Sequence, residues 1–205
     1  ALGYRTLFHR KQGFPGFPVE QEQVAHLGGL RQGRNLLAID VTTREVLWHY
    51  HEDAPIDSRA LCMKNGRIYA FRFGDYLTCL DASSGRVLWR KTKENAPPLF
   101  ETLDTYRNRQ GWQTNWRTTN YLKCGDEALY FAGPQMGKLV AVSTDDGHVL
   151  WEHPYDNFQL IIHPDAVYAI SGPWGNNVSR KFDPLTGEVL AELPTGRRAC
   201  TRPTA

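Results

Sequence analysis

Cysteine is scarce in this chain and is never arranged as a metal site. The 205 residues include four cysteines, Cys62, Cys79, Cys124 and Cys200, with no CxxC pair among them. This spacing argues against the common cysteine zinc sites. Cys62 and Cys79 fall on two predicted strands that a third strand separates, so no disulfide is expected between them. We expect small buried thiols instead.

An excess of one charge and long apolar runs are also lacking. The 24 Lys and Arg residues against 22 Asp and Glu leave a net charge of +2, which gives no general attraction to nucleic acid. No apolar run approaches the roughly 20 residues of a membrane-spanning helix. Residues 1–12 lack the apolar centre of a signal peptide. The chain starts without Met, midway into a repeat, so we expect a processed or partial chain.

Sequence motifs of common enzyme classes are missing as well. The chain has no GxSxG, HExxH, P-loop or GxGxxG pattern, so hydrolase and nucleotide-binding functions have little support. The seven histidines are scattered. His49 and His51 alternate on a predicted strand, and His153 lies two residues after Trp151. A metal site there would need a third ligand from another strand, so we expect solvent-exposed histidines.

What the sequence does contain is a repeated strand, turn and strand. The clearest copy is residues 76–89, YLTCLDASSGRVLW, in which Leu77 and Cys79, then Val87 and Trp89, alternate with other side chains. Gly85 supplies the left-handed backbone that such a turn often needs. The other copies are residues 36–48, 139–151 and 178–191.

The four copies share a spaced motif. In the clearest copy Cys79, Asp81, Gly85 and Trp89 stand at offsets 0, 2, 6 and 10. The same offsets hold Ala38, Asp40, Arg44 and Trp48; Ala141, Ser143, Gly147 and Trp151; and Lys181, Asp183, Gly187 and Ala191. This pattern resembles the Ala-x-Asp-x-x-x-Gly-x-x-x-Trp docking motif of quinoprotein-type (PQQ-repeat) β-propellers. The resemblance covers about residues 20–200, and four copies in register are not expected by chance.

The resemblance implies an all-β fold, a β-propeller of four-stranded antiparallel blades with about four PQQ-like repeats. In that family the Trp of one blade packs on the motif of its neighbour. The docking residues would be Trp48, Trp89, Trp151, Gly85, Gly147 and Gly187. The departures imply weaker docking and are Arg44 for Gly, Cys79 for Ala, Ser143 for Asp, and Lys181 and Ala191 in the last copy.

We expect residues 1–205 to form a single propeller domain or segment. A turn is expected at 31–35, before the first unit. The motif spacing is 41 residues from Asp40 to Asp81, 62 from Asp81 to Ser143 and 40 from Ser143 to Asp183. An insertion of about 20 residues therefore lies at about 93–115. Its residues 99–109 have weak helical character after Pro97 and Pro98.

The sequence is consistent with two arrangements of the blades in a closed ring. The sequence predicts three whole blades, three strands of an N-terminal blade and one C-terminal strand. The family usually has seven or eight blades, so the chain would be about half a ring, completed by missing chain or by a second subunit. Alternatively, the strand at 198–205 completes the N-terminal blade of a four-bladed ring.

Arginine and tryptophan side chains give the candidate binding site. Arg59, Arg117 and Arg198 each open a predicted innermost strand, and Trp112 and Trp116 lie beside Arg117. Converging at the channel mouth, these groups would suit planar anions, carboxylates or sugars. The alternative is surface salt bridges to Asp57, Glu101 or Asp104. Asp81 and Asp183 are expected to cap turns rather than to act chemically.

The function that we predict is a non-catalytic binding or scaffold module, bacterial and extracytoplasmic, either periplasmic or secreted. It would mediate protein or ligand interaction, with a protein partner, the completing propeller half or a second copy as the partner. One alternative is part of a PQQ-dependent dehydrogenase, which would bring PQQ and calcium. Another is a sensor domain of a larger signalling protein. The chain has no Cys-Cys pair and no recognisable calcium ligand set, so no catalytic residue, cofactor or metal is assigned.

Overall fold

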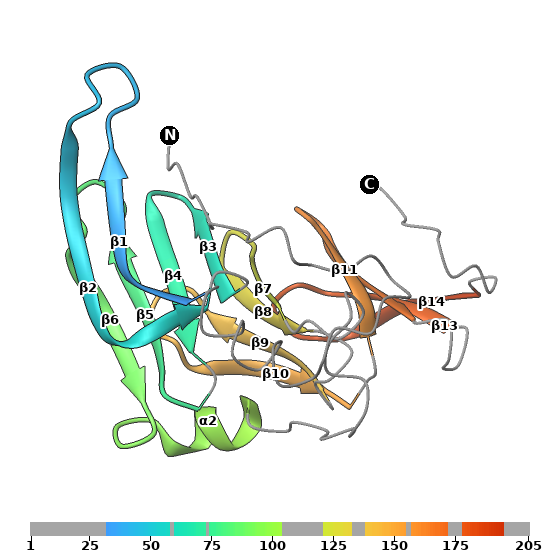
Figure 1. Cartoon of the computed structure of the whole chain (residues 1–205). Helices are drawn as coiled ribbons and strands as arrows, with labels where there is room; N and C mark the ends of the chain where they lie inside the picture. The colour runs from blue at the N-terminus through green and yellow to red at the C-terminus, as the bar shows by residue number, and fades with distance from the viewer. Residues whose placement is uncertain are drawn as a thin grey trace, which may run out of the picture.

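The computed structural model describes residues 32–57, 60–72, 74–103, 121–132, 138–154, 157–171 and 178–194. These residues form three four-stranded antiparallel sheets, one two-stranded sheet and a short helix. Within each four-stranded sheet, strands that follow one another in sequence are neighbours, so each sheet is a meander. The sheets lie side by side in chain order and correspond to the predicted blades (Figure 1).

We number the blades from 1 to 4. Blade 1 has two described strands, β1 (Gln32–Ile39) and β2 (Val46–Asp57). Blade 2 comprises β3 (Leu61–Lys64), β4 (Arg67–Arg72), β5 (Tyr76–Asp81) and β6 (Val87–Thr92). Blade 3 comprises β7 (Tyr121–Cys124), β8 (Ala128–Ala132), β9 (Leu139–Ser143) and β10 (Val149–His153). Blade 4 comprises β11 (Asn157–His163), β12 (Ala166–Ser171), β13 (Val178–Phe182) and β14 (Val189–Pro194).

The hairpin turns follow the local sequence. Asn65 and Gly66 join β3 to β4 with φ angles of 50° and 71°. Two consecutive left-handed residues are what a two-residue hairpin needs, and Asn-Gly is the pair that provides them most readily. The middle strands β8 and β9 are buried along their whole length because neighbouring blades cover both of their faces.

The hydrophobic core is divided among the blade interfaces. One cluster of buried side chains lies between blades 1 and 2, a second between blades 2 and 3, and a third between blades 3 and 4. Between blades 2 and 3, for example, Phe71 and Phe131 meet edge to face with ring centroids 4.9 Å apart. Each blade is therefore stabilised mainly by its neighbours, as in other repeat proteins.

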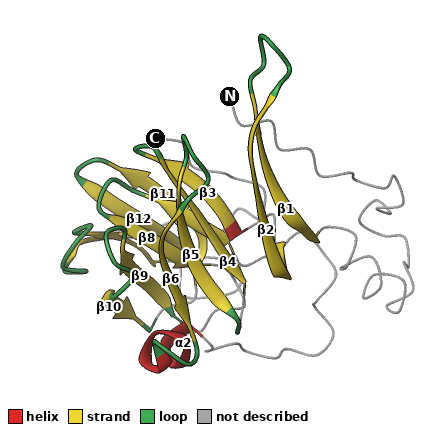
Figure 2. Cartoon of the chain, turned by 90° about the vertical axis from the view of Figure 1, so that its left-hand side faces the viewer, coloured by secondary structure: helices red, strands yellow, loops and turns green. Residues whose placement is uncertain are grey.

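The insertion begins with helix α2 (Pro97–Leu103), as the two prolines predict (Figure 2). Its apolar side chains, Leu99, Phe100 and Leu103, are buried in the cluster between blades 2 and 3. The start of the insertion therefore belongs to the core. Residues 104–120, the remainder of the insertion, lie outside the described residues.

One boundary prediction was wrong. Residues 31–35 were expected to turn, but β1 starts at Gln32 and pairs with β2 in an antiparallel register that sets Asn35 opposite His51. The turn-forming residues Gly33 and Asn35 are accommodated by a register shift between them. The strands expected at 24–30 and 198–205 lie outside the described residues. Across the described part of the chain, no helix is long and apolar enough to span a bilayer.

Candidate functional site: the seams between blades

The four repeats close with the same turn. In each repeat, the backbone amide of the residue four positions after the motif Asp or Ser donates a hydrogen bond to the backbone carbonyl of that Asp or Ser. The four bonds are Arg44 to Asp40 (2.8 Å), Gly85 to Asp81 (2.8 Å), Gly147 to Ser143 (3.1 Å) and Gly187 to Asp183 (3.1 Å). All four donors have a left-handed φ between 63° and 77°. Glycine fits this conformation without strain, whereas Arg44 adopts it despite its side chain.

The motif aspartates cap these turns, which agrees with the sequence prediction. Oδ1 of Asp81 accepts the amides of Ser83 (3.0 Å) and Ser84 (2.9 Å) and also both of their hydroxyls. Hydrogen bonds from the Ser83 and Ser84 hydroxyls lower the pKa of Asp81 to about 2. Backbone amides likewise lower the pKa of Asp40 and of Asp183. These carboxylates are therefore occupied in holding the turns.

Each described tryptophan of the motif contacts the turn of the next blade. The indole Nε1 donates a hydrogen bond to the backbone carbonyl of the residue directly after the motif Asp or Ser of the next blade. The bonds are Trp48 to Ala82 (3.0 Å), Trp89 to Thr144 (3.1 Å) and Trp151 to Pro184 (3.0 Å). Trp48 and Trp151 are buried, and Trp89 is half-buried.

The indole rings lie directly against the motif glycines. A Cβ atom built on Gly85 would lie 2.6 Å from Trp48, and one on Gly187 would lie 2.6 Å from Trp151. For Gly147 the separation from Trp89 would be 3.0 Å. The structure thus brings together the six predicted docking residues in three pairs, and the glycines provide both the left-handed turn and the space for a ring. How much each pair stabilises the fold stays a prediction.

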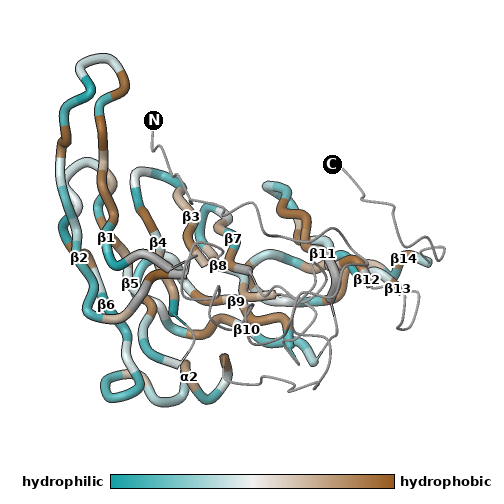
Figure 3. The backbone as a smooth tube through the Cα atoms, in the orientation of Figure 1, coloured by the Kyte–Doolittle hydropathy of each residue, from teal (hydrophilic) through white to brown (hydrophobic). Residues whose placement is uncertain are grey.

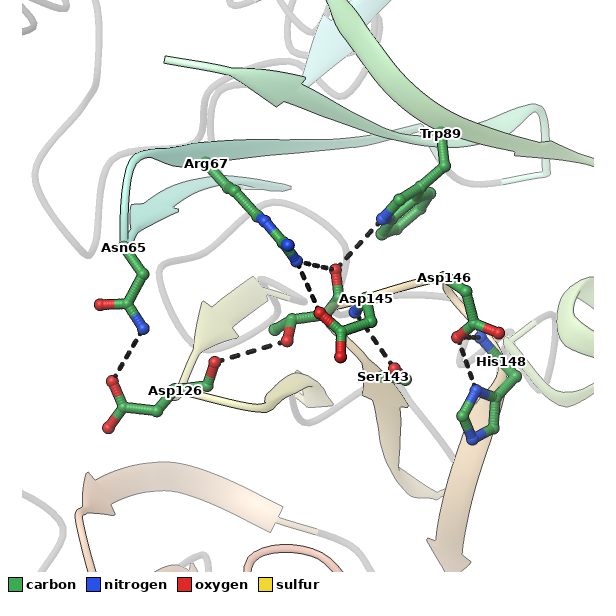
Figure 4. Close-up of polar contacts among 9 residues, drawn as sticks. Asn65, Arg67, Trp89, Asp126, Ser143, Asp145, Asp146 and His148 are labelled. Carbon is green, nitrogen blue, oxygen red and sulfur yellow. Dashed lines mark hydrogen bonds and ion pairs between the residues drawn. The ribbon is translucent and has the colours of Figure 1, made fainter. Parts of the chain in front are cut away.

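A polar network joins blades 2 and 3 (Figure 4). Nη1 of Arg67 donates to the carbonyl of Thr144 (3.1 Å) and to Oδ1 of Asp145 (2.8 Å). The Thr144 carbonyl also accepts the Trp89 indole bond, so one backbone oxygen receives two donors from blade 2. No sequence pattern pointed to Arg67, because its partners are 77 and 78 positions away.

Blades 1 and 2 share a buried ionic contact that the sequence analysis missed. Glu52 is only 4% exposed, and its carboxylate accepts hydrogen bonds from Tyr50 and from Arg90 of blade 2. The Arg90 guanidinium also lies over the ring of Tyr76, 4.4 Å from its centroid. Burial and the bond to Glu52 raise the pKa of Tyr50 to about 12. The available signal was the two-residue period that puts Tyr50 and Glu52 on the inward face with Trp48.

Blades 3 and 4 are joined by aromatic and backbone contacts. Trp151 stacks on Phe182 with a centroid distance of 5.6 Å and an interplanar angle of 22°. The Tyr130 hydroxyl donates to the Pro184 carbonyl (3.1 Å), which also accepts the Trp151 indole. Lys123 donates to the carbonyl of Leu160, and burial lowers the pKa of this lysine.

The predicted anion or sugar site lies outside the described residues. Its candidates are Arg59, Trp112, Trp116, Arg117 and Arg198. Their convergence at a channel mouth therefore stays a prediction.

Among the described residues, no three His, Cys, Asp or Glu side chains lie close enough together to hold a metal ion. His49 and His51 are exposed, as expected, and both contact Oδ1 of Asn35 at 2.8 Å.

The cysteines are placed partly as predicted. Cys79 is buried, and β4 separates its strand from that of Cys62, so these two are not neighbouring positions. Cys62 and Cys124 are half-buried and lie next to one another across the seam between blades 2 and 3. That proximity was not predicted. Cys200 lies outside the described residues.

Comparison with known proteins agrees with this architecture. The model of the family described as outer membrane protein assembly factor BamB matches residues 32–199. No curated protein matches. The crystal structure of BamB from Moraxella catarrhalis is 16% identical, with a TM-score of 0.49, over 78% of this chain and 47% of that one.

A second structure, the computationally designed Ika8 protein, is 13% identical with a TM-score of 0.50, over 82% of this chain and 48% of that one. The chain thus spans about half the length of these solved structures. The family match covers most of the sequence, and it includes all four repeats and all three described seams. The chain belongs to the PQQ-repeat β-propeller family described as outer membrane protein assembly factor BamB.

Proposed function

We propose that the chain is a non-catalytic scaffold module that binds a protein partner outside the cytoplasm. The observation that carries the proposal is the exposed apolar surface of the β1–β2 hairpin. Five large apolar side chains there are 37–65% exposed: Leu37, Ile39, Val41, Val46 and Leu47. Exposed apolar groups gathered on one element commonly mark a protein interaction site.

The two faces of the hairpin differ in what they contact. Leu36, Ala38 and Trp48 point inward and pack on blade 2, while Leu37 and Ile39 alternate with them on the other face. Figure 3 shows apolar stretches along β1 and at the tip of the hairpin. The hairpin therefore has one face committed to the blade array and a second face suited to another protein surface.

Blade 4, at the other end of the array, has a comparable feature. Val189, Leu190 and Leu193 of β14 are exposed. Because the chain spans about half the length of the two solved structures, we propose that the first partner is the protein surface that completes the ring. That surface belongs either to another part of the same polypeptide or to another subunit.

The family description supports a more specific role. Its members are described as an outer membrane protein assembly factor. We propose that this chain also acts in outer membrane protein assembly, as a binding module rather than an enzyme. An extracytoplasmic location follows from that role.

The test is affinity purification of the full reading frame from cells that make an outer membrane. Leu47→Glu and Val41→Glu, on the hairpin, are compared with Met63→Glu, a matched substitution at an exposed apolar residue of blade 2. We expect the hairpin variants to lose a co-purifying assembly protein or ring-completing subunit that Met63→Glu retains. Equal retention by all three variants would contradict the proposed surface. Dehydrogenase turnover after addition of PQQ and calcium would contradict the non-catalytic role.

A further inference from the structure

We propose that Cys62 and Cys124 are a disulfide-forming pair that joins blade 2 to blade 3. Cys62 lies on β3 and Cys124 on β7, the first strands of their blades, and these two strands contact one another. The residues paired with them, Tyr69 on β4 and Leu129 on β8, both belong to the buried cluster between the two blades, so both thiols face this seam. This inference does not depend on the proposed function.

Contacts at the ends of the same two strands hold the two cysteines in register. Asp126 lies two residues after Cys124, and its carboxylate is 3.1 Å from Nζ of Lys64, which lies two residues after Cys62. The same carboxylate accepts a hydrogen bond from Asn65 at 3.1 Å. The ends of the two strands are therefore joined two to three residues beyond the cysteines, which keeps the cysteines opposite one another.

The surroundings of the two thiols favour a bond between them over a bond to another sulfur of the chain. Both side chains pack against the cluster between blades 2 and 3, and neither is fully buried. Cys79 is not an equivalent partner, because its strand is separated from β3 by β4. A small reagent can thus reach the pair, while the two strands limit the alternative sulfurs within reach.

Either thiol of the pair can attack a disulfide as its thiolate, and the other thiol then resolves the mixed disulfide. The order of attack does not change the product, which is one bond between Cys62 and Cys124.

The oxidant is a small disulfide, for which oxidised glutathione is the probe. One cysteine of the pair loses its proton to water and attacks one sulfur of the probe, and the first glutathione leaves as a thiolate that takes up a proton. The other cysteine then loses its proton to water and attacks the protein sulfur of the mixed disulfide, which expels the second glutathione as a thiolate that is protonated in turn. Two protein thiols are oxidised to one disulfide, and one glutathione disulfide is reduced to two thiols.

The experiment treats the reduced, folded chain with oxidised glutathione, counts the remaining thiols and maps peptides by mass spectrometry. We expect two of the four thiols to disappear and one peptide pair to join Cys62 to Cys124. Cys79→Ser should lose the same two thiols. Cys62→Ser and Cys124→Ser should each stop at a glutathione adduct on the remaining cysteine of the pair, because the second thiol is missing.

Three outcomes would overturn the proposal. One is a link that maps to another pair, such as one containing Cys200 or one between two chains. A second is retention of all thiols under conditions that oxidise a control dithiol peptide. The third is the same Cys62 to Cys124 link at equal yield in urea-unfolded chain, because the pairing would then owe nothing to the folded register. Circular dichroism of Cys62→Ser checks that the variant is folded.

Discussion

The glycines under the docking tryptophans allow a graded test of the seams. Gly187 has a φ of 72°, and a Cβ on it would lie 2.6 Å from Trp151. Gly66 has nearly the same φ, 71°, but a Cβ there meets nothing within 4 Å. Alanine at both positions therefore imposes the same backbone strain, and only Gly187→Ala adds a collision. The difference between the two variants isolates the packing of the tryptophan.

The magnitudes follow from these two contributions. A left-handed alanine costs about 1–2 kcal/mol in the folded state. Alanine also restricts the unfolded chain, which offsets about 0.4–1 kcal/mol of that cost, so Gly66→Ala should lower the stability by about 1 kcal/mol. Overpacking adds about 1–3 kcal/mol at Gly187, because Phe182 stacks on Trp151 and limits its retreat. Gly187→Ala should thus lose about 2–4 kcal/mol. Gly147→Ala should fall between them, since its Cβ would lie 3.0 Å from Trp89.

Urea unfolding followed by circular dichroism measures these differences, because fluorescence would itself change with the tryptophans. Stabilities are compared at a constant m value. In the double variant Gly187→Ala/Trp151→Ala the collision is gone, so its loss of stability should be about 1–3 kcal/mol smaller than the sum of the losses of the two single variants. Equal losses for Gly66→Ala and Gly187→Ala, or strict additivity in the double variant, would refute the reasoning.

Three further predictions concern other parts of the structure. Glu52→Gln should lower the free energy of unfolding in urea by about 2 kcal/mol, less than for a fully buried pair because Arg90 is 36% exposed. The control is Glu192→Gln, at the ion pair with Arg180, which should change the stability by less than about 1 kcal/mol. Similar losses for the two variants would contradict the role of Glu52. The pKa of Asp81 is depressed in the folded state from 3.8 to about 2, so its contribution to stability is present above pH 3.8 and is lost as the pH falls toward about 2. A pH titration of melting temperature should show that loss, and Asp81→Asn should flatten it. Leu103→Ala should cost about 2–5 kcal/mol, whereas exposed Glu101→Ala should stay within about 0.5 kcal/mol; equal effects would remove helix α2 from the core.

Much of the fold was predictable because its determinants are local and repeated. The Asn65-Gly66 hairpin, the aspartate-capped turns and the strands around them all follow from residues close in sequence. The position of helix α2 followed from Pro97 and Pro98. A boundary failed at residues 31–35, where a register shift lets turn-forming residues continue a strand.

The contacts across the seams were predictable only in part. The motif indicated which tryptophans and glycines would meet, but not that a backbone carbonyl would accept each indole bond. Glu52 and Arg90, or Cys62 and Cys124, come from different blades, and their approach depends on how far one blade is displaced against the next. No spacing along the chain encodes that displacement, so these pairs became visible only in three dimensions.

The first and the last repeat of the described array each lack one group of the indole–glycine contact. Every described seam is head-to-tail, with an indole from one blade received over a glycine of the next, and a contact of that kind can propagate into open-ended polymers. Blade 4 has Ala191 in place of the indole, and blade 1 has Arg44 in place of the glycine. Since even a Cβ at Gly85 would lie 2.6 Å from Trp48, the left-handed Arg44 leaves no room for an incoming ring. A further blade or a second copy that met the array at either of these turns would therefore need contacts other than the indole–glycine pair that forms the three described seams.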